Sequence, residues 1–375
     1  MRFVDIGPRD SRQPAVTAPD AEFEMWRNGV RQSVLGHVGE FVEARCLPQL
    51  QGTGVDIAPD VLAQFLDGGK CLRSTFMYLG WLCGAEPDPE VNAAALRASA
   101  GLDLLHAFAL LQDDVMDDSP LRRGRPAAHV RFEQWHRDRR LSGSAERFGN
   151  SMAILLSDLC LVWAEQMMRE SGLGSEPLSR AWPHYDAMRI ELAVGQAADV
   201  AGEAGALPTL DAVLDVARRK SGNYTVRRPL EIGAAMAGCD ELLGPLGSYG
   251  RLVGEAFQLR DDILGVFGAP SVTGKPAGGD LADRKATSVV VAAAQMADPA
   301  IRRQFTDLMS ADELGEADIA HWRTLIVATG AVDLVEDMIA ERVATATEHI
   351  CHDGIDEQVR AALAGMAAAC TQRST

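Results

Sequence analysis

From Ala21 onward, apolar residues recur at intervals of three and four along almost the whole chain, and this period restricts the fold most. Such spacing gathers apolar side chains on one face of a helix, whereas a half-buried strand needs strict alternation. Alanine and leucine dominate, and runs of β-branched residues are few. The period predicts helices over residues 22–46, 59–66, 91–118 and 151–168. The segment 91–118 is apolar on most faces and is expected to be central.

Glycine, proline and polar clusters mark the interruptions. Residues 137–150 and 268–280 are interpreted as polar loops, and residues 1–20 as a flexible N-terminal tail because they lack an apolar period. No internal repeat, interdomain linker or glycine-rich nucleotide-binding signature occurs. The sequence therefore predicts an all-α fold in which residues 21–375 form a single domain, a bundle of long helices.

Charge and cysteine content exclude several classes of protein. The chain has 36 Lys and Arg against 53 Asp and Glu, a net charge of −17. Such a surface repels nucleic acid and anionic lipid, so neither is an expected partner. No uninterrupted apolar stretch reaches the roughly 18 residues that a stable membrane span needs. Seven scattered cysteines without a CxxC pair argue against a disulfide framework or a zinc site. A cytoplasmic location is the simplest expectation.

A carboxylate cluster ends the apolar segment 91–118. Asp113 and Asp117 are four residues apart and share a helix face, as do Asp114 and Asp118. The preceding ten residues are nearly all apolar, which places the cluster at the mouth of a core rather than on a solvated helix end. Mg²⁺ prefers one or two carboxylates plus substrate phosphate oxygens. Arginines at 122–123 follow and suit phosphate oxygens. The pattern predicts a metal–diphosphate site.

A second cluster lies far downstream. Asp261 and Asp262 end another apolar helical stretch, and Lys275, Asp280 and Lys285 follow in or after a glycine-rich loop. One such acidic pair carries little information alone. Two acidic clusters, each followed by basic residues, predict facing halves of one multi-metal diphosphate site.

With these clusters in place, the sequence from about residue 30 to about 360 resembles the trans-isoprenyl diphosphate synthases, the polyprenyl synthetase family. Five motifs occur in the family's order: GGKCLRS at 68–74 resembles GGKxxRP, DDVMD at 113–117 resembles DDxxD, GQAAD at 195–199 resembles GQxxD, KSGNYT at 220–225 resembles KTGxYT, and residues 254–262 resemble the second aspartate-rich motif. The resemblance implies a fold of long helices around a central cavity, isopentenyl and allylic diphosphates as substrates, three Mg²⁺ ions, and a homodimer.

The resemblance also implies a role for each matching residue. Asp113 and Asp117 would hold two Mg²⁺ ions with Asp114 in support, and Asp261 the third with Asp262 behind it. The remaining expected site residues are Arg122, Lys220 and Lys275 for the allylic diphosphate, Lys70, Arg73, His106 and Arg123 for isopentenyl diphosphate, Thr225 as a further substrate-binding residue, Gln258 and Asp199 at the reacting centre, and Lys285 closing the C-terminal side.

The sequence departs from the family pattern in two places. Gly265 stands where the second aspartate-rich motif often has its third Asp, so metal binding is expected to be weakened but retained. Cys71 and Ser74 replace the usual Arg and Pro around the phosphate ligands Lys70 and Arg73. Isopentenyl diphosphate binding is therefore expected to survive.

Residues just before the first aspartate-rich motif are expected to set product length. In the resembling family, bulky aromatic residues four and five places before the first Asp stop the chain at C15. Here these positions hold Ala109 and Phe108, with Leu105 about a turn further down. A small Ala109 favours C20, geranylgeranyl diphosphate, and Phe108 argues against very long chains. C15 is the second candidate.

Two further interpretations are a class I terpene cyclase on the same fold and a non-catalytic subunit of a heteromeric synthase.

Overall fold

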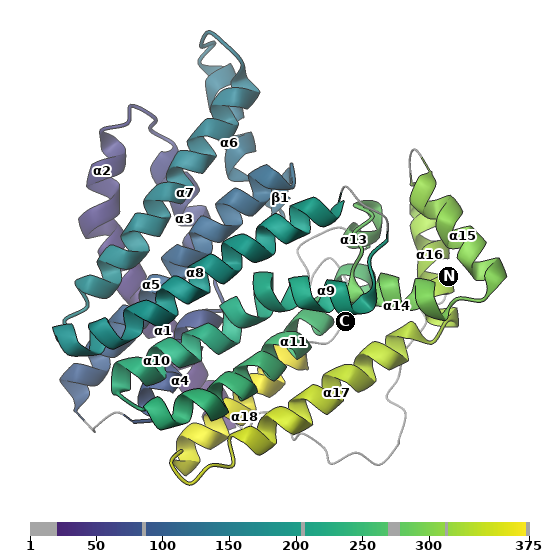
Figure 1. Cartoon of the computed structure of the whole chain (residues 1–375). Coiled ribbons are helices and arrows are strands. Elements are labelled where there is room, and N and C mark those ends of the chain that lie inside the picture. The colour runs from purple at the N-terminus through teal and green to yellow at the C-terminus, as the bar shows by residue number, and fades with distance from the viewer. Residues whose placement is uncertain (1–20, 85–87, 204–206, 269–277, 312–313, 373–375) are drawn as a thin grey trace.

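The computed structural model describes residues 21–84, 88–203, 207–268, 278–311 and 314–372, so the expected tail at 1–20 lies outside the described residues. These residues are almost entirely helical (Figure 1), and the all-α prediction is confirmed. The helices are α1 (Ala21–Phe41), α2 (Leu47–Gln51), α3 (Ala58–Leu66), α4 (Leu72–Leu82), α5 (Pro89–Met116), α6 (Ala128–Asp138), α7 (Ala145–Arg169), α8 (Ser175–Glu203), α9 (Leu210–Ala217), α10 (Arg228–Ala237), α11 (Leu243–Phe267), α13 (Gly279–Ala282), α14 (Ser288–Met296), α15 (Pro299–Ser310), α16 (Glu316–Ala328), α17 (Ala331–His349) and α18 (Glu357–Thr371).

Two π-helical segments and a small hairpin complete the architecture. The segments are η1 (Val42–Cys46) and η2 (Arg218–Arg227), and η3 (Asp240–Leu242) is a short 3₁₀ turn. Strands β1 (Leu121–Arg122) and β2 (Arg125–Pro126) pair antiparallel. All four predicted helical segments are confirmed, but the loop predicted over 137–150 is shorter than expected and spans only residues 139–144 between α6 and α7. Helix α7 begins at Ala145, because the Ser144 side chain accepts a hydrogen bond from the Arg147 amide and caps the helix.

Helix α5 lies in the core, as the sequence predicts, and packs against α1, α3, α4, α6 and α7. Leu102, Leu104, Leu105 and Leu111 on this helix are fully buried. Each such side chain contributes about 1.5–3 kcal/mol relative to an exposed one. Figure 1 shows α17 running beside α11, around which a second group of buried residues gathers. Both groups contact Ala237, which supports the expectation of one domain.

Helices α4 and α10 contact through their backbones. A Cβ atom at Gly80 would lie 3.0 Å from the Ala234 amide nitrogen and closer still to the Leu230 carbonyl oxygen. One at Gly233 would lie 2.7 Å from the Trp81 nitrogen. Only glycine fits at these two positions. Because α4 begins directly after the glycine-rich segment 68–71, this contact fixes the base from which that segment projects.

Two helices, α5 and α7, have the length and apolar composition that a membrane crossing requires. The most apolar 18-residue window of α5 is 61% buried inside the protein, and that of α7 is 44% buried. A core position accounts for the composition of α5. The exposed apolar face of α7 includes Ile154, Leu155 and Val162.

Candidate active site

The end of α5 and the hairpin after it bring the first aspartate cluster together with an arginine. Asp118 has a left-handed backbone (φ 47°), so the helix stops there. Arg123 and Gly124, with φ of 53° and 72°, make the tight turn between β1 and β2. This turn brings Arg122 back over the helix end. Its Nε donates to Asp114 Oδ1 at 2.8 Å, and a second guanidinium nitrogen donates to Asp113 at 3.2 Å.

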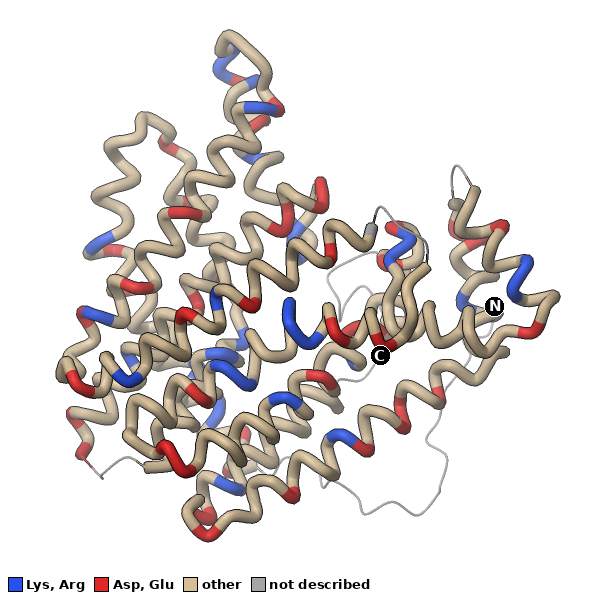
Figure 2. Tube along the Cα trace, in the orientation of Figure 1, with Lys and Arg blue, Asp and Glu red and all other residues tan. Residues whose placement is uncertain are grey.

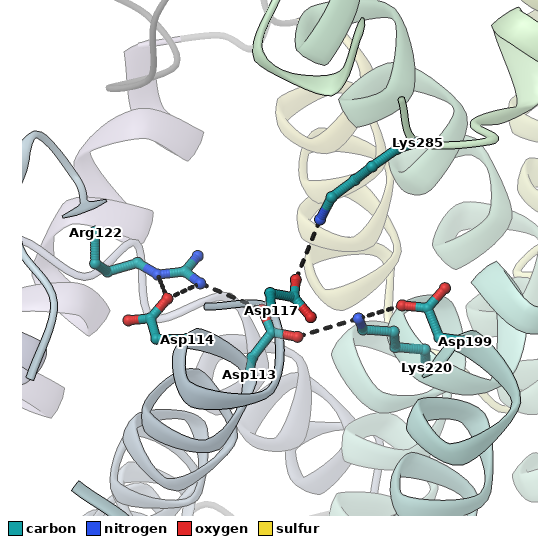
Figure 3. A network of polar contacts seen from close by, with 7 residues as sticks. All are labelled: Asp113, Asp114, Asp117, Arg122, Asp199, Lys220 and Lys285. Carbon is teal, nitrogen blue, oxygen red and sulfur yellow. Dashed lines mark hydrogen bonds and ion pairs between the residues drawn. The ribbon is translucent and has the colours of Figure 1, made fainter. Parts of the chain in front are cut away.

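Two lysines from distant segments reach the same carboxylates (Figure 3). Lys220, in η2, lies 3.1 Å from Asp113 Oδ1 and donates to Asp199 at 2.6 Å. Lys285, between α13 and α14, donates to Asp117 Oδ2 at 3.1 Å. Burial alone would raise the pKa of Asp113, but the charges of Lys220 and Arg122 outweigh it and hold this pKa below its ordinary value. The carboxylate of Asp113 is therefore ionised at neutral pH.

Cationic side chains gather at this site although the whole molecule is acidic. Figure 2 shows acidic residues spread over the helices, while the basic start of η2 lies in the middle of the view. A diphosphate would meet the side chains of Lys220, Arg122 and Lys285 there. Four carboxylates, Asp113, Asp114, Asp117 and Asp199, surround these three cations (Figure 3), so binding of a diphosphate there would also need the positive charge of a metal ion.

The two residues of the second aspartate pair, Asp261 and Asp262 on α11, have different surroundings. Asp262 is buried and accepts hydrogen bonds from the Ser288 amide (2.9 Å), the Ser288 hydroxyl (2.6 Å) and the Gln258 amide group (2.9 Å). Burial raises its pKa to about 6. Asp262 thus ties α14 to α11, while the half-buried Asp261 is close enough for its charge to influence the pKa of Arg73.

The residues expected to bind isopentenyl diphosphate gather beside this carboxylate cluster. Arg73 donates to Thr225 Oγ1 at 2.9 Å, and its guanidinium stacks 4.3 Å above the Tyr224 ring. His106 lies against the same ring. Burial, and then the charge of Arg73, lower the pKa of His106 well below its ordinary value, so its imidazole is neutral. A separate cavity of about 170 Å³ is lined by residues that include Gly68, Arg122 and Arg123, but not by Arg73 or His106.

One half-buried carboxylate beside the site was not foreseen from the sequence. Asp103, inside α5, accepts a short hydrogen bond from the Ser74 hydroxyl, and it is close enough to Cys71 to affect the thiol's pKa. Cys71 itself has a left-handed backbone (φ 48°). Asp103 therefore supports the turn that carries Lys70 and Arg73. Its only signal in the sequence is a single acidic residue in an otherwise apolar stretch.

A larger cavity of about 990 Å³ lies between α5, α7, α8 and η2. Asp113, Lys220, Arg73 and His106 line it, as do Phe108 and Ala109, and it extends to apolar residues of the neighbouring helices such as Leu161 and Ile190. Leu105 is fully buried and does not line the described part of this cavity. Lys275 lies outside the described residues. Of the other expected site residues, Lys70 lies just before α4, Asp199 lies on α8, and Lys285 lies between α13 and α14. The rest lie on α4, on α5 or at its end, in the hairpin, on η2 and on α11.

The carboxylates fit Mg²⁺ bound together with a phosphorylated ligand. Within the described ranges, no three acidic, histidine or cysteine side chains converge into a closed metal cage. Mg²⁺ does not need one, because it takes one or two carboxylates and completes its octahedron with water and phosphate oxygens. Asp113 and Asp117 share one side of α5, and the Oδ2 atom of the buried Asp114 has no hydrogen-bond partner among the described residues.

Comparison with known proteins places the chain among related enzymes. Residues 56–326 match the Polyprenyl synthetase family. A geranylfarnesyl diphosphate synthase from Aeropyrum pernix is 34% identical over 72% of this chain and 79% of its own length. A geranylgeranyl diphosphate synthase from Mycobacterium tuberculosis is 31% identical over 74% and 73%. The crystal structure of a Corynebacterium glutamicum geranylgeranyl pyrophosphate synthase, complexed with isoprenyl diphosphate and magnesium, has a TM-score of 0.85 and 35% identity over 92% of this chain and 99% of that one.

Proposed function

Because the chain belongs to the polyprenyl synthetase family and is a prenyltransferase, we propose that it condenses isopentenyl diphosphate with an allylic diphosphate to give a trans prenyl diphosphate. The observation that carries this proposal is the meeting of two substrate-sized environments. The carboxylates and lysines at the end of α5 suit one diphosphate. Arg73 and His106, which line the same large cavity, and Arg123, which lines the smaller one, suit a second.

The proposed chemistry follows from charge. Bound Mg²⁺ would neutralise charge on the allylic diphosphate as it leaves. Lys220, Arg122 and Lys285 grip the leaving diphosphate, so the allylic C–O bond can ionise. Arg73 and the neutral His106 hold isopentenyl diphosphate with its double bond toward the resulting cation. A new C–C bond forms, and the proton lost from the adjacent carbon passes to the released diphosphate. The apolar cavity walls exclude water that would quench the cation.

A class I terpene cyclase is the alternative chemistry. A cyclase ionises the allylic diphosphate but binds no isopentenyl diphosphate, so it needs no second phosphate pocket. Here the half-buried Arg73 donates to Thr225, lies over the Tyr224 ring and lines the large cavity beside the carboxylates. A cation in this position suits a second phosphate group. The second pocket therefore favours the synthase.

We propose C20 as the product. The small Ala109 and the bulky Phe108 both line the large cavity, so the cavity continues past the position of Ala109 while Phe108 narrows it. The related enzymes carry names that imply C20 in one case and C25 in another. C15 stays the second candidate.

We further propose a cytoplasmic homodimer. On α8, Val194 is exposed, as are Ile190 and Val200, which also line the large cavity; on α7, Leu155 and Val162 form an exposed apolar stripe, seven residues apart. Exposed apolar residues of this kind support an interface with a second copy of the chain. All seven cysteines are free thiols, which suits a reducing compartment.

The decisive experiment incubates the purified protein with Mg²⁺, labelled isopentenyl diphosphate and each allylic diphosphate from C5 to C15, and then sizes the products. We expect label in prenyl diphosphates up to C20. Release of cyclic hydrocarbon from the allylic substrate, with no label consumed, would favour the cyclase.

A further inference from the structure

Gly265, on α11, faces a carboxylate that comes from another segment. A Cβ atom built at Gly265 would lie 2.5 Å from Cγ of Asp280 and 3.2 Å from its Oδ1, with Oδ2 closer still. The carboxylate of Asp280 therefore occupies the space into which a side chain at position 265 would point. Position 265 follows Asp261 by four residues, so both lie on one face of α11.

The short helix α13 holds Asp280 in this place. Gly278, before the helix, has φ of 77°, and a Cβ there would lie 2.6 Å from Ile319 and 3.1 Å from Arg323, so only glycine allows the approach. Leu281 next to Asp280 is fully buried. The Lys285 amide donates to the Asp280 carbonyl at 2.8 Å and closes the turn after α13.

The charge of Asp280 also affects the pKa values of Asp262 and Lys285. Burial is the main cause of the raised pKa of Asp262, and the charge of Asp280 adds to it. Burial alone would lower the pKa of Lys285, but the charges of Asp117 and Asp280 raise it. Asp280 is therefore close enough to both Asp262 and Lys285 for its charge to affect their pKa values. Asp262 cannot serve in its place, because Ser288 and Gln258 already engage both of its carboxylate oxygens.

We propose that Asp280 supplies, from α13, the carboxylate that α11 lacks at position 265, and that it binds the third metal ion together with Asp261. The proposal rests on the proposed function. It reverses the simple expectation for Gly265, since the glycine does not mark a lost ligand. It leaves room for a ligand from a different helix.

The proposal has a specific consequence for substitutions at position 265. Gly265→Ala adds only a methyl group and no charge, but this group cannot coexist with the present position of Asp280. Gly265→Asp does not simply add a ligand, because its Cβ displaces the existing one. Gly265→Asp combined with Asp280→Ala moves the carboxylate back onto α11 and removes the collision.

The experiment titrates Mn²⁺ into the full-length protein, saturated with the unreactive thiolo analogue of geranyl diphosphate, and counts bound ions by electron paramagnetic resonance. We expect Gly265→Ala and Asp280→Asn each to weaken the last-bound ion by about tenfold or more. The double variant Gly265→Asp/Asp280→Ala should recover most of the affinity. Asp283→Asn, which removes the same charge from an exposed position at the end of α13, should bind as the wild type does.

Two results would overturn the assignment: wild-type Mn²⁺ binding by Gly265→Ala, or equal effects of Asp280→Asn and Asp283→Asn. Because Gly265→Ala leaves Asp280 intact, it keeps the test open if the Asp280 variants fail to fold. Loss of the last ion in Gly265→Ala, in a protein that consumes no isopentenyl diphosphate, would support the assignment and overturn only the proposed reaction.

Discussion

The ammonium group of Lys285 lies 3.1 Å from Asp117 Oδ2, although 168 positions separate the two residues in the chain. This bond joins the segment after α13 to the end of α5. It therefore couples the C-terminal half of the molecule to the first aspartate cluster.

Replacing Lys285 tests this coupling. Lys285→Met keeps the length of the side chain but removes its charge, and a hydrogen bond to a charged group contributes about 1.5–3 kcal/mol. We expect the KM for the allylic diphosphate to rise about tenfold or more, with little change for isopentenyl diphosphate. Initial-rate kinetics measure both, and Lys285→Arg should retain most of the affinity. An equal rise of both KM values would contradict a specific role at the allylic site.

Asp113 is expected to be essential for turnover. Asp113→Asn keeps the shape of the side chain but removes the charge paired with Lys220. We expect kcat to fall about 10²-fold or more, the scale seen when a preorganised electrostatic group is deleted. The matched control is Asp118→Asn, since Asp118 is exposed and asparagine tolerates its left-handed backbone. Similar kcat values for the two variants would exclude the metal-binding role of Asp113.

Product length should respond to the two cavity-lining residues on α5. Phe108→Ala opens the cavity and should lengthen the products, whereas Ala109→Phe narrows it and should shorten them toward C15. One turn of helix rises about 5.4 Å, close to one extended isoprene unit. Mass spectrometry of the products measures the change, with Phe148→Leu, at a packed ring beside Trp135, as the control. An unchanged distribution in both cavity variants would mean that α5 does not set the length.

The unfolding free energy of the metal-free protein should depend on pH because Asp262 titrates. Its pKa in the folded protein is about 6, above the ordinary 3.8, so the native state binds this proton more tightly than the unfolded chain. The resulting stabilisation is present below about pH 4 and is lost as the pH rises through 6.

Asp262→Asn removes this titration while its amide oxygen can still accept from Ser288. Between pH 4 and 7.5 the wild type should lose about 3 kcal/mol of unfolding free energy relative to the variant, at about 1.4 kcal/mol per pKa unit. Urea denaturation in EDTA measures the difference. Parallel pH profiles of the two proteins would show that Asp262 is ionised in the native state throughout this range.

A charge among the exposed apolar residues of α7 and α8 should separate the proposed dimer. We expect Val194→Glu on α8 or Val162→Glu on α7 to halve the mass measured by light scattering after gel filtration, because an unpaired carboxylate is costly to bury. Val327→Glu places the same charge at an exposed valine on α16 and should leave the mass unchanged. A monomeric wild type would refute the dimer.

The helices and both aspartate clusters were predictable because their signals are local. Apolar spacing marks α5, and the spacing of Asp113 and Asp117 follows from the helical repeat alone. The hairpin at 121–126 was not predicted as strands, because the arginines at 122–123 were interpreted only as groups for phosphate oxygens. The meeting of Asp280 with Gly265 could not be predicted either. It depends on how α13 packs against its neighbours, which no local pattern encodes.

The backbone contact between α4 and α10 has a mechanical consequence. Two helices that touch through Gly80 and Gly233, without intervening side chains, cannot slide past one another without breaking backbone packing. The contact between α4 and α10 therefore holds the turn that carries Lys70 and Arg73 in a fixed position. Any adjustment as successive isoprene units are added must come from the opposite wall, where Lys285 and Asp280 reach in from segments that are attached to α11 by side chains. The turn with Lys70 and Arg73 is therefore the rigid side of the site, and the segments with Lys285 and Asp280 form the side that can move.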